Sequence, residues 1–266
     1  MAKFSRELLF AKKIAVNGGR LALKRFNNTE YSFKKPRDFV TAADTEVEKY
    51  LFKAVRRKFP RHSILSEEGD NDDGAAGTNF KWIIDPIDGT ANFANGIPIF
   101  SVSVGVEKNA KPFAGAVYFP VTGELFYAEK GKGAYLNGEK IKVRTKSYPD
   151  IITLLGLSSS SEKLEKGLKV LNHFAKTTLY VHLPRATCFS LCAIAAGRVD
   201  ASISPTSSAW DYAASVVILE EAGGTIASTD GKPFDLYQKD GYVAASSREL
   251  LDVLVGKVKL LWRQGF

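Results

Sequence analysis

The sequence predicts an α/β protein whose two halves are built differently. Residues 6–25 and 45–59 repeat apolar side chains at the three- and four-residue spacing of amphipathic helices. Short apolar segments between 100 and 128 are separated by Gly- and Pro-containing turns, which is typical of an antiparallel sheet. From 151 to 222 expected strands alternate with expected helices, which indicates βαβ layers. We therefore expect an α+β N-terminal half and an α/β C-terminal half.

The two patterns meet in a short polar stretch, 146–150. We expect it to separate an N-terminal half, 1–147, from a C-terminal half, 148–266, with the two halves joined in one compact unit. A chain of 266 residues can bury a large core, and its 45% apolar and 25% charged residues are typical of a globular protein.

Individual elements follow from the same patterns. The first expected helix contains Gly18 and Gly19, which weaken its middle, and the second ends at Pro60. Asn137 and Gly138 predict a tight hairpin. The remaining strands are expected at 62–66, 82–84, 100–106, 113–118, 124–128, 151–157, 178–182 and 201–204, and the remaining helices at 163–175, 189–196 and 212–222.

Composition and charge narrow the class of protein. No apolar run approaches the roughly 20 residues that cross a bilayer, and residues 1–7 contain no apolar signal-peptide core, so we expect a cytoplasmic protein without membrane contact. The net charge of +8 raises nucleic acid as a partner. The basic residues are spread along the chain beside acids, and no nucleic-acid motif occurs. We expect no nucleic acid polymer as partner, and a positive surface that steers a small phosphorylated substrate.

Cys188 and Cys192 are the two cysteines, and they lie four residues apart in a segment with helical character. Side chains at this spacing share one face of a helix. We interpret them as buried free thiols; a zinc site that also uses His182 is the alternative.

The apolar run 82–84 is followed directly by Asp85, Asp88, Gly89 and Thr90. Ligands bind beyond the carboxyl ends of strands in open α/β sheets, so the two carboxylates are expected to point at one place. Two carboxylates attract a hard cation, whereas free N–H groups at a helix start attract an anion. This stretch therefore predicts a metal-bound phosphate, with a simple turn and helix cap as the alternative.

The segment WIIDPIDGTANF, 82–93, resembles the signature of the inositol monophosphatase family. This family belongs to a superfamily of lithium-sensitive, Mg²⁺-dependent phosphatases that also includes fructose-1,6-bisphosphatase-like enzymes. Further segments at 38–44, 62–69 and 210–224 resemble family motifs in the family's order, so the resemblance covers nearly the whole chain. It implies a layered αβαβα sandwich, two or three Mg²⁺ ions with Mn²⁺ as a substitute, lithium sensitivity and a homodimer.

The resemblance also implies roles for particular residues. As metal ligands it indicates the carbonyl of Ile87 and the carboxylates of Glu67, Asp85, Asp88 and Asp211. All are oxygen donors, which suits Mg²⁺ better than Zn²⁺.

Each acid outside the central stretch also has a purely structural interpretation. Glu67 belongs to a pair of Glu residues, and the structural alternative is that this pair protects an exposed sheet edge from aggregation. Asp211 stands where an N-cap residue belongs, and Gly223 where the helix after it ends. Thr41 and Asp44 form a possible capping box, whereas the resemblance places Asp44 in or beside the metal cluster.

The expected chemistry is attack by an activated water, without a covalent nucleophile. We expect Glu67 and Thr90, with Asp44, to be the catalytic side chains, and the N–H groups of Gly89 and Thr90 to hold the phosphate. Asp211 is expected to contact both metal and substrate.

Substrate choice is where the sequence departs from the family. Inositol-hydrolysing members have a Glu several residues before the Trp-Asp pair; this chain has Ser204 in the corresponding segment, and Arg185 begins an altered Gly-Ser-Ala-like element. We expect both residues to contact the substrate, with Arg185 meeting a second anionic group. The expected substrate is inositol monophosphate or a sugar phosphate such as fructose 1,6-bisphosphate. The alternatives are 3′-phosphoadenosine 5′-phosphate, histidinol phosphate, or a non-catalytic relative that binds metal and phosphate.

Overall fold

The two N-terminal helices cover one face of a large sheet in the computed structural model, which describes residues 3–35, 38–69, 71–158, 160–206, 208–238 and 240–263. Helix α1 (Arg6–Arg25) begins after Ser5, whose hydroxyl accepts the N–H of Leu8. Helix α2 (Ala42–Lys58) packs beside it. Both expected helices are confirmed. Gly19 has a packing role, because a Cβ there would lie 2.4 Å from the ring of Tyr118.

The large sheet has seven strands in the order β3-β4-β5-β6-β7-β8-β9. All neighbours are antiparallel except β3 and β4, which run parallel. The expected antiparallel sheet is therefore confirmed, and Asn137 and Gly138 form the expected tight turn with positive φ angles of 49° and 97°. The strands are β3 (Ser63–Ser66), β4 (Phe80–Asp88), β5 (Ser101–Lys108), β6 (Lys111–Phe119), β7 (Glu124–Glu129), β8 (Ala134–Leu136) and β9 (Glu139–Ile141).

Strand β4 is longer than the sequence predicts. The expected strand at 82–84 ends before the carboxylates, whereas β4 continues to Asp88. Its pairing with β5 is interrupted between Asp85 and Asp88, where Pro86 cannot donate a ladder hydrogen bond. Both carboxylates therefore belong to the buried end of a strand rather than to the loop after it.

Helices α5 (Thr187–Ala195) and α6 (Ala209–Glu221) lie on the face of the large sheet opposite to α1 and α2. Gly105 of β5 and Gly115 of β6 are opposite each other and leave room for α6: a Cβ at Gly115 would lie 2.3 Å from the carbonyl oxygen of Ala214. This close approach brings the first turn of α6 near the end of β4. Both helices were expected, and each begins two or three residues earlier than predicted.

The second sheet has five strands in the order β11-β10-β12-β14-β13. β10 runs parallel to β11 and β12, as expected from the βαβ pattern, whereas β14 is antiparallel to both of its neighbours. The last two strands and helix α7 are not predicted from the sequence. The elements are β10 (Ile152–Leu155), α4 (Ser161–Thr177), β11 (Tyr180–His182), β12 (Ala201–Ser204), β13 (Thr225–Ser228), β14 (Tyr242–Ala245) and α7 (Arg248–Arg263).

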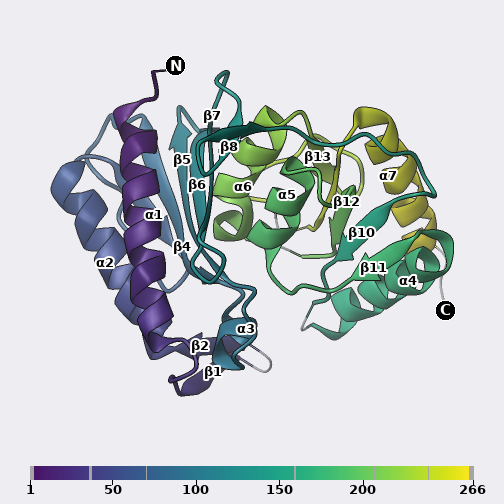
Figure 1. Cartoon of the computed structure of the whole chain (residues 1–266), viewed down its shortest axis with the longest axis horizontal. Helices are drawn as coiled ribbons and strands as arrows, with labels where there is room; N and C mark the ends of the chain where they lie inside the picture. The colour runs from purple at the N-terminus through teal and green to yellow at the C-terminus, as the bar shows by residue number, and fades with distance from the viewer. Residues whose placement is uncertain are drawn as a thin grey trace.

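Figure 1 shows the resulting five layers: α1 and α2, the seven-stranded sheet, α5 and α6, the five-stranded sheet, and α4 with α7. The expected αβαβα sandwich is confirmed. The expected boundary between 147 and 148 lies in the connection between the two sheets. Two small elements complete the fold, the hairpin of β1 (Tyr31–Lys35) with β2 (Asp38–Thr41), and helix α3 (Thr90–Ala94), which packs on β2.

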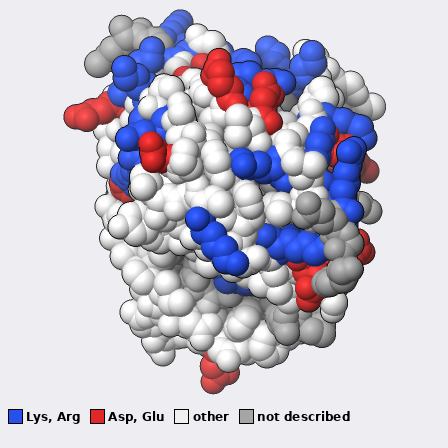
Figure 2. All heavy atoms as spheres, turned by 90° about the vertical axis from the view of Figure 1, so that its right-hand side faces the viewer, with Lys and Arg blue, Asp and Glu red and all other residues white. Residues whose placement is uncertain are grey.

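The charge on the surface and the apolar character of the helices can be compared with the expected absence of nucleic-acid and membrane partners. On the face of the C-terminal half, Lys and Arg side chains gather in the upper and right-hand parts with acidic side chains among them, and the lower part is mostly uncharged (Figure 2). None of the helices in the described ranges has the length and apolar character that a membrane crossing requires.

Candidate active site

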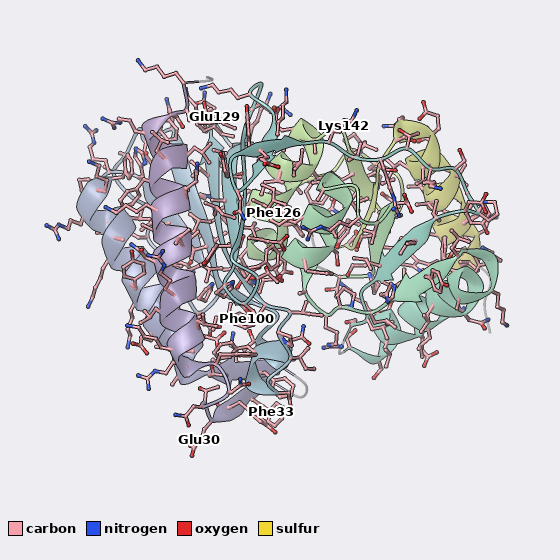
Figure 3. The ribbon with its side chains drawn as sticks, in the orientation of Figure 1. Glu30, Phe33, Phe100, Phe126, Glu129 and Lys142 are labelled. Atoms are coloured by element: carbon pink, nitrogen blue, oxygen red, sulfur yellow. The ribbon has the colours of Figure 1, made fainter. Side chains whose placement is uncertain are left out.

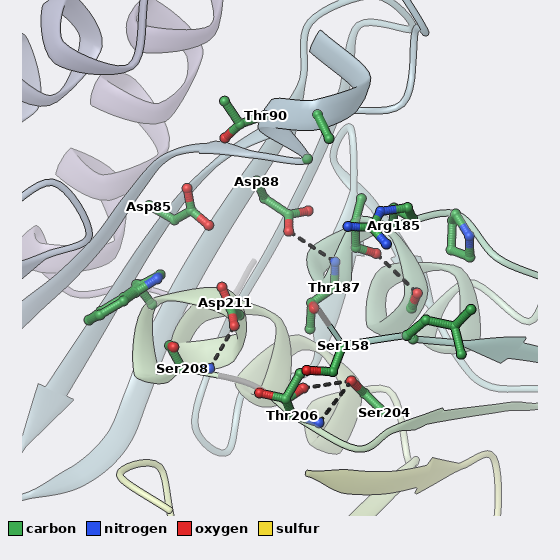
Figure 4. Close-up of a pocket in the computed structure, with 18 of the residues that line it drawn as sticks. Asp85, Asp88, Thr90, Ser158, Arg185, Thr187, Ser204, Thr206, Ser208 and Asp211 are labelled. Carbon is green, nitrogen blue, oxygen red and sulfur yellow. Dashed lines mark hydrogen bonds between the residues drawn. The ribbon is translucent and has the colours of Figure 1, made fainter. Parts of the chain in front are cut away.

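A cavity of about 560 Å³ lies where β4, the starts of α3, α5 and α6, and the end of β12 come together. Figure 4 shows Asp85, Asp88, Thr90, Arg185 and Asp211 around this space. The structure thus brings together residues that the sequence places far apart. The predicted site residues that line the cavity are Glu67, Asp85, Ile87, Asp88, Gly89, Thr90, Arg185, Ser204 and Asp211.

Asp88 is held by the first turn of α5. Its carboxylate accepts the backbone N–H groups of Thr187 at 2.9 Å and Cys188 at 3.1 Å, and the hydroxyl of Ser101 at 3.4 Å. Burial raises the pKa of Asp88 to about 7, although these N–H groups oppose the shift. The sequence does not predict the contribution of α5, because backbone groups make it and no side-chain type signals it.

Asp85 is buried, and its Oδ1 has no hydrogen-bond partner in the described part of the chain. Burial and then the charges of Glu67 and Asp88 raise its pKa well above the ordinary value. A buried carboxylate oxygen without a partner is costly unless a cation or donor meets it. A cation or a donor bound in the cavity would satisfy this oxygen, which no described residue does.

Glu67 follows β3 and faces Lys34 of the β1–β2 hairpin, with Nζ 3.3 Å from Oε1. Burial raises the pKa of Glu67 to about 7; Lys34 opposes this shift, while Asp211 and Glu68 add to it. Burial disfavours the charged ammonium of Lys34, but the two neighbouring Glu residues outweigh burial and raise its pKa. Lys34 is missed from the sequence because the hairpin that carries it is not predicted.

Thr90 connects Asp44 to the site. Its Oγ1 lies 3.1 Å from Asp44 Oδ1 and 2.9 Å from the carbonyl of Ile87. Thr90 is not a cap, since the N-cap of α3 is Gly89 with a φ of 89°. Asp44 also forms the expected capping box with Thr41, so it caps α2 and contacts Thr90 of the site at the same time. Asp44 itself lies behind Thr90 and is not part of the cavity lining.

The environment of Asp44 sets its proton affinity. Its Oδ2 accepts the N–H of Thr41 at 2.8 Å and the hydroxyl of Thr41 at 2.6 Å. Burial nevertheless raises the pKa of Asp44 to about 6. A carboxylate with this pKa is ionised at neutral pH and can still take up a proton, which is what general-base catalysis requires.

Asp211 occupies a different helix position from the expected one. The N-cap of α6 is Ser208, and Asp211 is the third helical residue, whose Oδ2 accepts the N–H of Ser208 at 2.6 Å. Burial raises the pKa of Asp211 to about 7. Asp211 can take part in the capping box and also line the cavity, because the bond to Ser208 uses only Oδ2 of its carboxylate.

The donor set determines whether a divalent cation fits here. No three His, Cys, Asp or Glu side chains in the described ranges form a group that could hold a metal ion by themselves. The buried acids nevertheless repel one another, and Asp85 has an oxygen without a partner. Mg²⁺ keeps several waters and shares phosphate oxygens, so it does not need a closed protein cage. The residues present therefore fit a hard cation.

Arg185 and Ser204 also line the cavity, Arg185 just before α5 and Ser204 at the end of β12. Arg185 has a φ of 53°, and no described carboxylate pairs with its guanidinium. The hydroxyl of Ser204 is 2.5 Å from the carbonyl of Thr206, so it is engaged in its own loop.

The thiols of Cys188 and Cys192 are free and buried, as expected. Burial raises the pKa of both thiols well above the ordinary value, so they stay neutral. Cys188 Sγ lies 3.2 Å from the carbonyl oxygen of Asp211 and packs between α5 and α6.

Comparisons with known proteins agree with this geometry. The model of the inositol monophosphatase family matches residues 4–262. The chain is 32% identical to the fructose-1,6-bisphosphatase/inositol-1-monophosphatase of Aquifex aeolicus, over 97% of both chains, and 34% identical to human inositol monophosphatase 1, over 95% and 94%. The crystal structure of the extragenic suppressor protein suhB from Bartonella henselae matches with a TM-score of 0.90 and 28% identity, over 96% of this chain and 99% of that one. The chain therefore belongs to the inositol monophosphatase family.

Proposed function

We propose that this protein is a Mg²⁺-dependent phosphomonoesterase that hydrolyses a small phosphate ester with an activated water. The observation that carries the proposal is the set of buried acids with raised pKa values around one cavity, next to the Thr90–Asp44 pair. Acids that repel one another in this way are destabilising without a cation. They are useful in a site that binds cations together with a phosphate.

The cations are proposed to bind to Glu67, Asp85, Asp88 and Asp211 and to the carbonyl of Ile87. Two or three Mg²⁺ ions would supply neutralisation of phosphate charge and a more acidic water, with Mn²⁺ as a substitute. The N–H groups of Thr187 and Cys188 fix the direction of the Asp88 carboxylate, and those of Gly89 and Thr90 are proposed to hold the phosphate.

Hydrolysis needs a base and an orienting group for the attacking water. We assign orientation to Thr90 and Glu67, and proton uptake to the carboxylate of Glu67 or, through the Thr90 hydroxyl, to Asp44. The water gives a proton to this base as its oxygen forms a bond to phosphorus. The ester P–O bond breaks, and the leaving oxygen takes the proton back from the base, so that the products are an alcohol and inorganic phosphate. Glu67→Gln should then lower kcat more than it raises KM; unchanged turnover would remove Glu67 from this role.

The substrate is proposed to be inositol monophosphate or a sugar phosphate such as fructose 1,6-bisphosphate. The names of the two relatives compared above support both compounds. Arg185 favours a substrate with a second anionic group, because its guanidinium has no described carboxylate partner. Ser204 cannot replace the carboxylate that other members direct at a polyol, which weakens the case for inositol phosphate.

A non-catalytic binder of metal and phosphate is the second candidate. It is favoured by the structural match to suhB, whose name describes a suppressor rather than an enzyme. The pair of Thr90 and Asp44 argues for the enzyme, because a binder has no need of a water-orienting group beside a base. The remaining family expectations, a cytoplasmic homodimer that lithium inhibits, are kept as part of the proposal.

Phosphate release tests the proposal directly. The purified chain is incubated with inositol 1-phosphate, fructose 1,6-bisphosphate, 3′-phosphoadenosine 5′-phosphate and histidinol phosphate, with Mg²⁺ and with a chelator. We expect release from at least one ester that stops with the chelator. Phosphate and Mg²⁺ binding without release from any ester would establish the binder instead.

A further inference from the structure

A second cavity, of about 590 Å³, lies between α1 and α2, which form the outer layer beside the large sheet in Figure 1. Its apolar lining comes from Phe10 and Ile14 of α1 and from Tyr50 and Ala54 of α2. Ala54 lies one turn after Tyr50 on the same face of α2, and because its side chain ends at Cβ it leaves room between the two helices. We call this cavity the α1–α2 groove and these four side chains its floor.

Contacts within the fold fix the aromatic rings of the floor. Phe10 packs edge-on against Phe59 and Trp82, with ring centroids 5.4 Å and 6.0 Å apart. The hydroxyl of Tyr50 accepts a hydrogen bond from Nδ2 of Asn17 at 3.1 Å, which joins α2 to α1. A ligand that enters a preformed apolar site does not have to order the side chains around it, so less of its binding free energy is lost.

The edge of the groove is basic. Side chains that end in nitrogen project from the outer faces of α1 and α2 (Figure 3). The exposed cations that line the groove are Lys13, Lys53, Arg57 and Lys58. The lining contains no acid, and no described carboxylate forms an ion pair with any of these four, whereas the neighbouring Arg56 pairs with Asp72. An apolar floor beside unpaired cations is complementary to a ligand that is apolar along its length and anionic at one end.

The size of the groove favours a small molecule over a macromolecule. Eight residues line it, whereas a stable protein interface uses roughly 20–30 residues on each side. Its lining on α2 extends from residue 50 to residue 58, which is about 12 Å at the rise of an α-helix. A bilayer presents a broad surface that cannot fill a recess between two helices, whereas a single alkyl chain can.

We propose that the α1–α2 groove binds a free fatty acid, with the alkyl chain along the floor and the carboxylate among the four cations. The chain removes apolar surface of the floor from water, and the methylene groups of Lys53 and Arg57 pack along it while their charged ends meet the carboxylate. This site goes beyond the proposed phosphatase function, and it shares no residue with the lining of the active-site cavity.

The experiment measures the Kd of dodecanoate for the purified full chain by calorimetry, at concentrations below micelle formation. Octanoate tests the role of the chain, and dodecyltrimethylammonium, with the same chain and a positive head group, tests the role of the charge. Ala54→Leu fills the groove, and the double variant Lys53→Gln/Arg57→Gln removes two cations. Lys49→Gln, at an exposed cation of α2 outside the groove lining, is the matched control.

We expect dodecanoate to bind the parent and octanoate to bind about tenfold more weakly, because four methylene groups lose part of their apolar contact. Dodecyltrimethylammonium should not bind. The double variant should raise the Kd of dodecanoate about tenfold, a few-fold for each exposed cation, and Ala54→Leu should raise it at least as much. Lys49→Gln should keep the Kd of the parent. The double variant changes exposed side chains alone, so it decides the test if Ala54→Leu does not fold.

Three results would overturn the proposal. The first is equal Kd values for the parent and the double variant, and the second is equal binding of dodecanoate and dodecyltrimethylammonium. The third is cosedimentation with vesicles of phosphatidylglycerol and phosphatidylcholine that the double variant loses and Ala54→Leu keeps, which would assign the cations to a membrane surface. Light scattering of the parent and Ala54→Leu checks the remaining occupant: a dimer that becomes a monomer in Ala54→Leu would place a second copy of the chain in the groove and overturn the fatty acid.

Discussion

The two walls of the cavity carry opposite chemistry. The wall formed by β4 and the end of β3, here called the acid wall, presents Glu67, Asp85 and Asp88. The lining of residues 184–190, here called the α5 wall, contains Arg185 and the first turn of α5 and no acid. The walls meet where Thr187 and Cys188 donate to Asp88. The difference suggests a division of labour: the acid wall fixes which reaction is possible, and the α5 wall positions one acid and meets the rest of the substrate.

Asp88→Asn should break the acid wall with the largest effect. The amide keeps the shape of the side chain but removes the charge. Because α5 donates one N–H to each oxygen of Asp88, the NH₂ group of the amide would face one of these donors and lose that hydrogen bond. We expect kcat to fall about 10³-fold with Mg²⁺, in the range seen when one preorganised electrostatic group is lost. The measurement is phosphate release at saturating substrate. Asp252→Asn, on the exposed face of α7, is the control and should keep full activity; a similar loss there would point to a general effect of purification.

Asp44→Asn tests the group behind the acid wall. It should lower kcat about 10²-fold, the lower range for general acid–base catalysis. Because the pKa of Asp44 is about 6, its protonation adds to that of Glu67 as pH falls through 6, so the decline in activity at low pH should be less steep in the variant than in the parent. Thr90→Ala should resemble Asp44→Asn, and Thr90→Ser should retain most activity. An unchanged acid limb in Asp44→Asn would remove Asp44 from the mechanism.

The acid wall, together with Asp211 of α6, also predicts how the stability of the metal-free protein depends on pH. The pKa values of Glu67, Asp88 and Asp211 are raised to about 7 in the fold, from ordinary values of 4.5, 3.8 and 3.8. The folded state therefore binds more protons than the unfolded state between about pH 4 and 7, so stability falls as pH rises through this window. We expect a higher Tm at pH 5.5 than at pH 8 in chelator, by several degrees, and a smaller difference with Mg²⁺.

A matched variant separates the acid wall from the rest of the chain in that measurement. Asp85→Asn removes one of the repelling charges, so the difference in Tm between pH 5.5 and pH 8 should shrink. Asp252→Asn should leave the difference unchanged, because this residue is exposed. A Tm in chelator that rises from pH 5.5 to pH 8 would show that the buried acids are compensated within the protein.

The acid wall could be predicted from the sequence much better than the α5 wall. The acids of 82–93 stand in a contiguous signature, and apolar periodicity predicts the helices and most strands around them. The end of β4 could not be located, because a proline and two acids normally end a strand, whereas burial on both faces and pairing with Ser101 extend this one to Asp88. Asp211 was expected as the N-cap for a similar local reason, although Ser208 caps the helix.

The features of the site that the sequence does not predict depend on backbone groups or on side chains that are distant in the sequence. The donors to Asp88 are N–H groups, which every residue except proline possesses, so residue type gives no signal for them. Lys34 is 33 residues from Glu67, on a hairpin whose strands are only five and four residues long. The approach of α6 depends on Gly105 and Gly115 lying side by side, which only the strand register reveals.

Arg185→Gly tests the α5 wall, and we expect it to change the kinetics less than the substitutions in the acid wall do. Residue 185 has a φ of 53°, which glycine adopts easily, so the substitution removes the guanidinium without backbone strain. We expect KM for fructose 1,6-bisphosphate to rise about fivefold, a modest change because the side chain is exposed. KM for inositol 1-phosphate, which has no second phosphate, should stay within twofold, and Arg185→Lys should give an intermediate value for the bisphosphate. A rise of the same size for both substrates would mean that the α5 wall holds the reacting phosphate, and that the division between the two walls does not apply to Arg185.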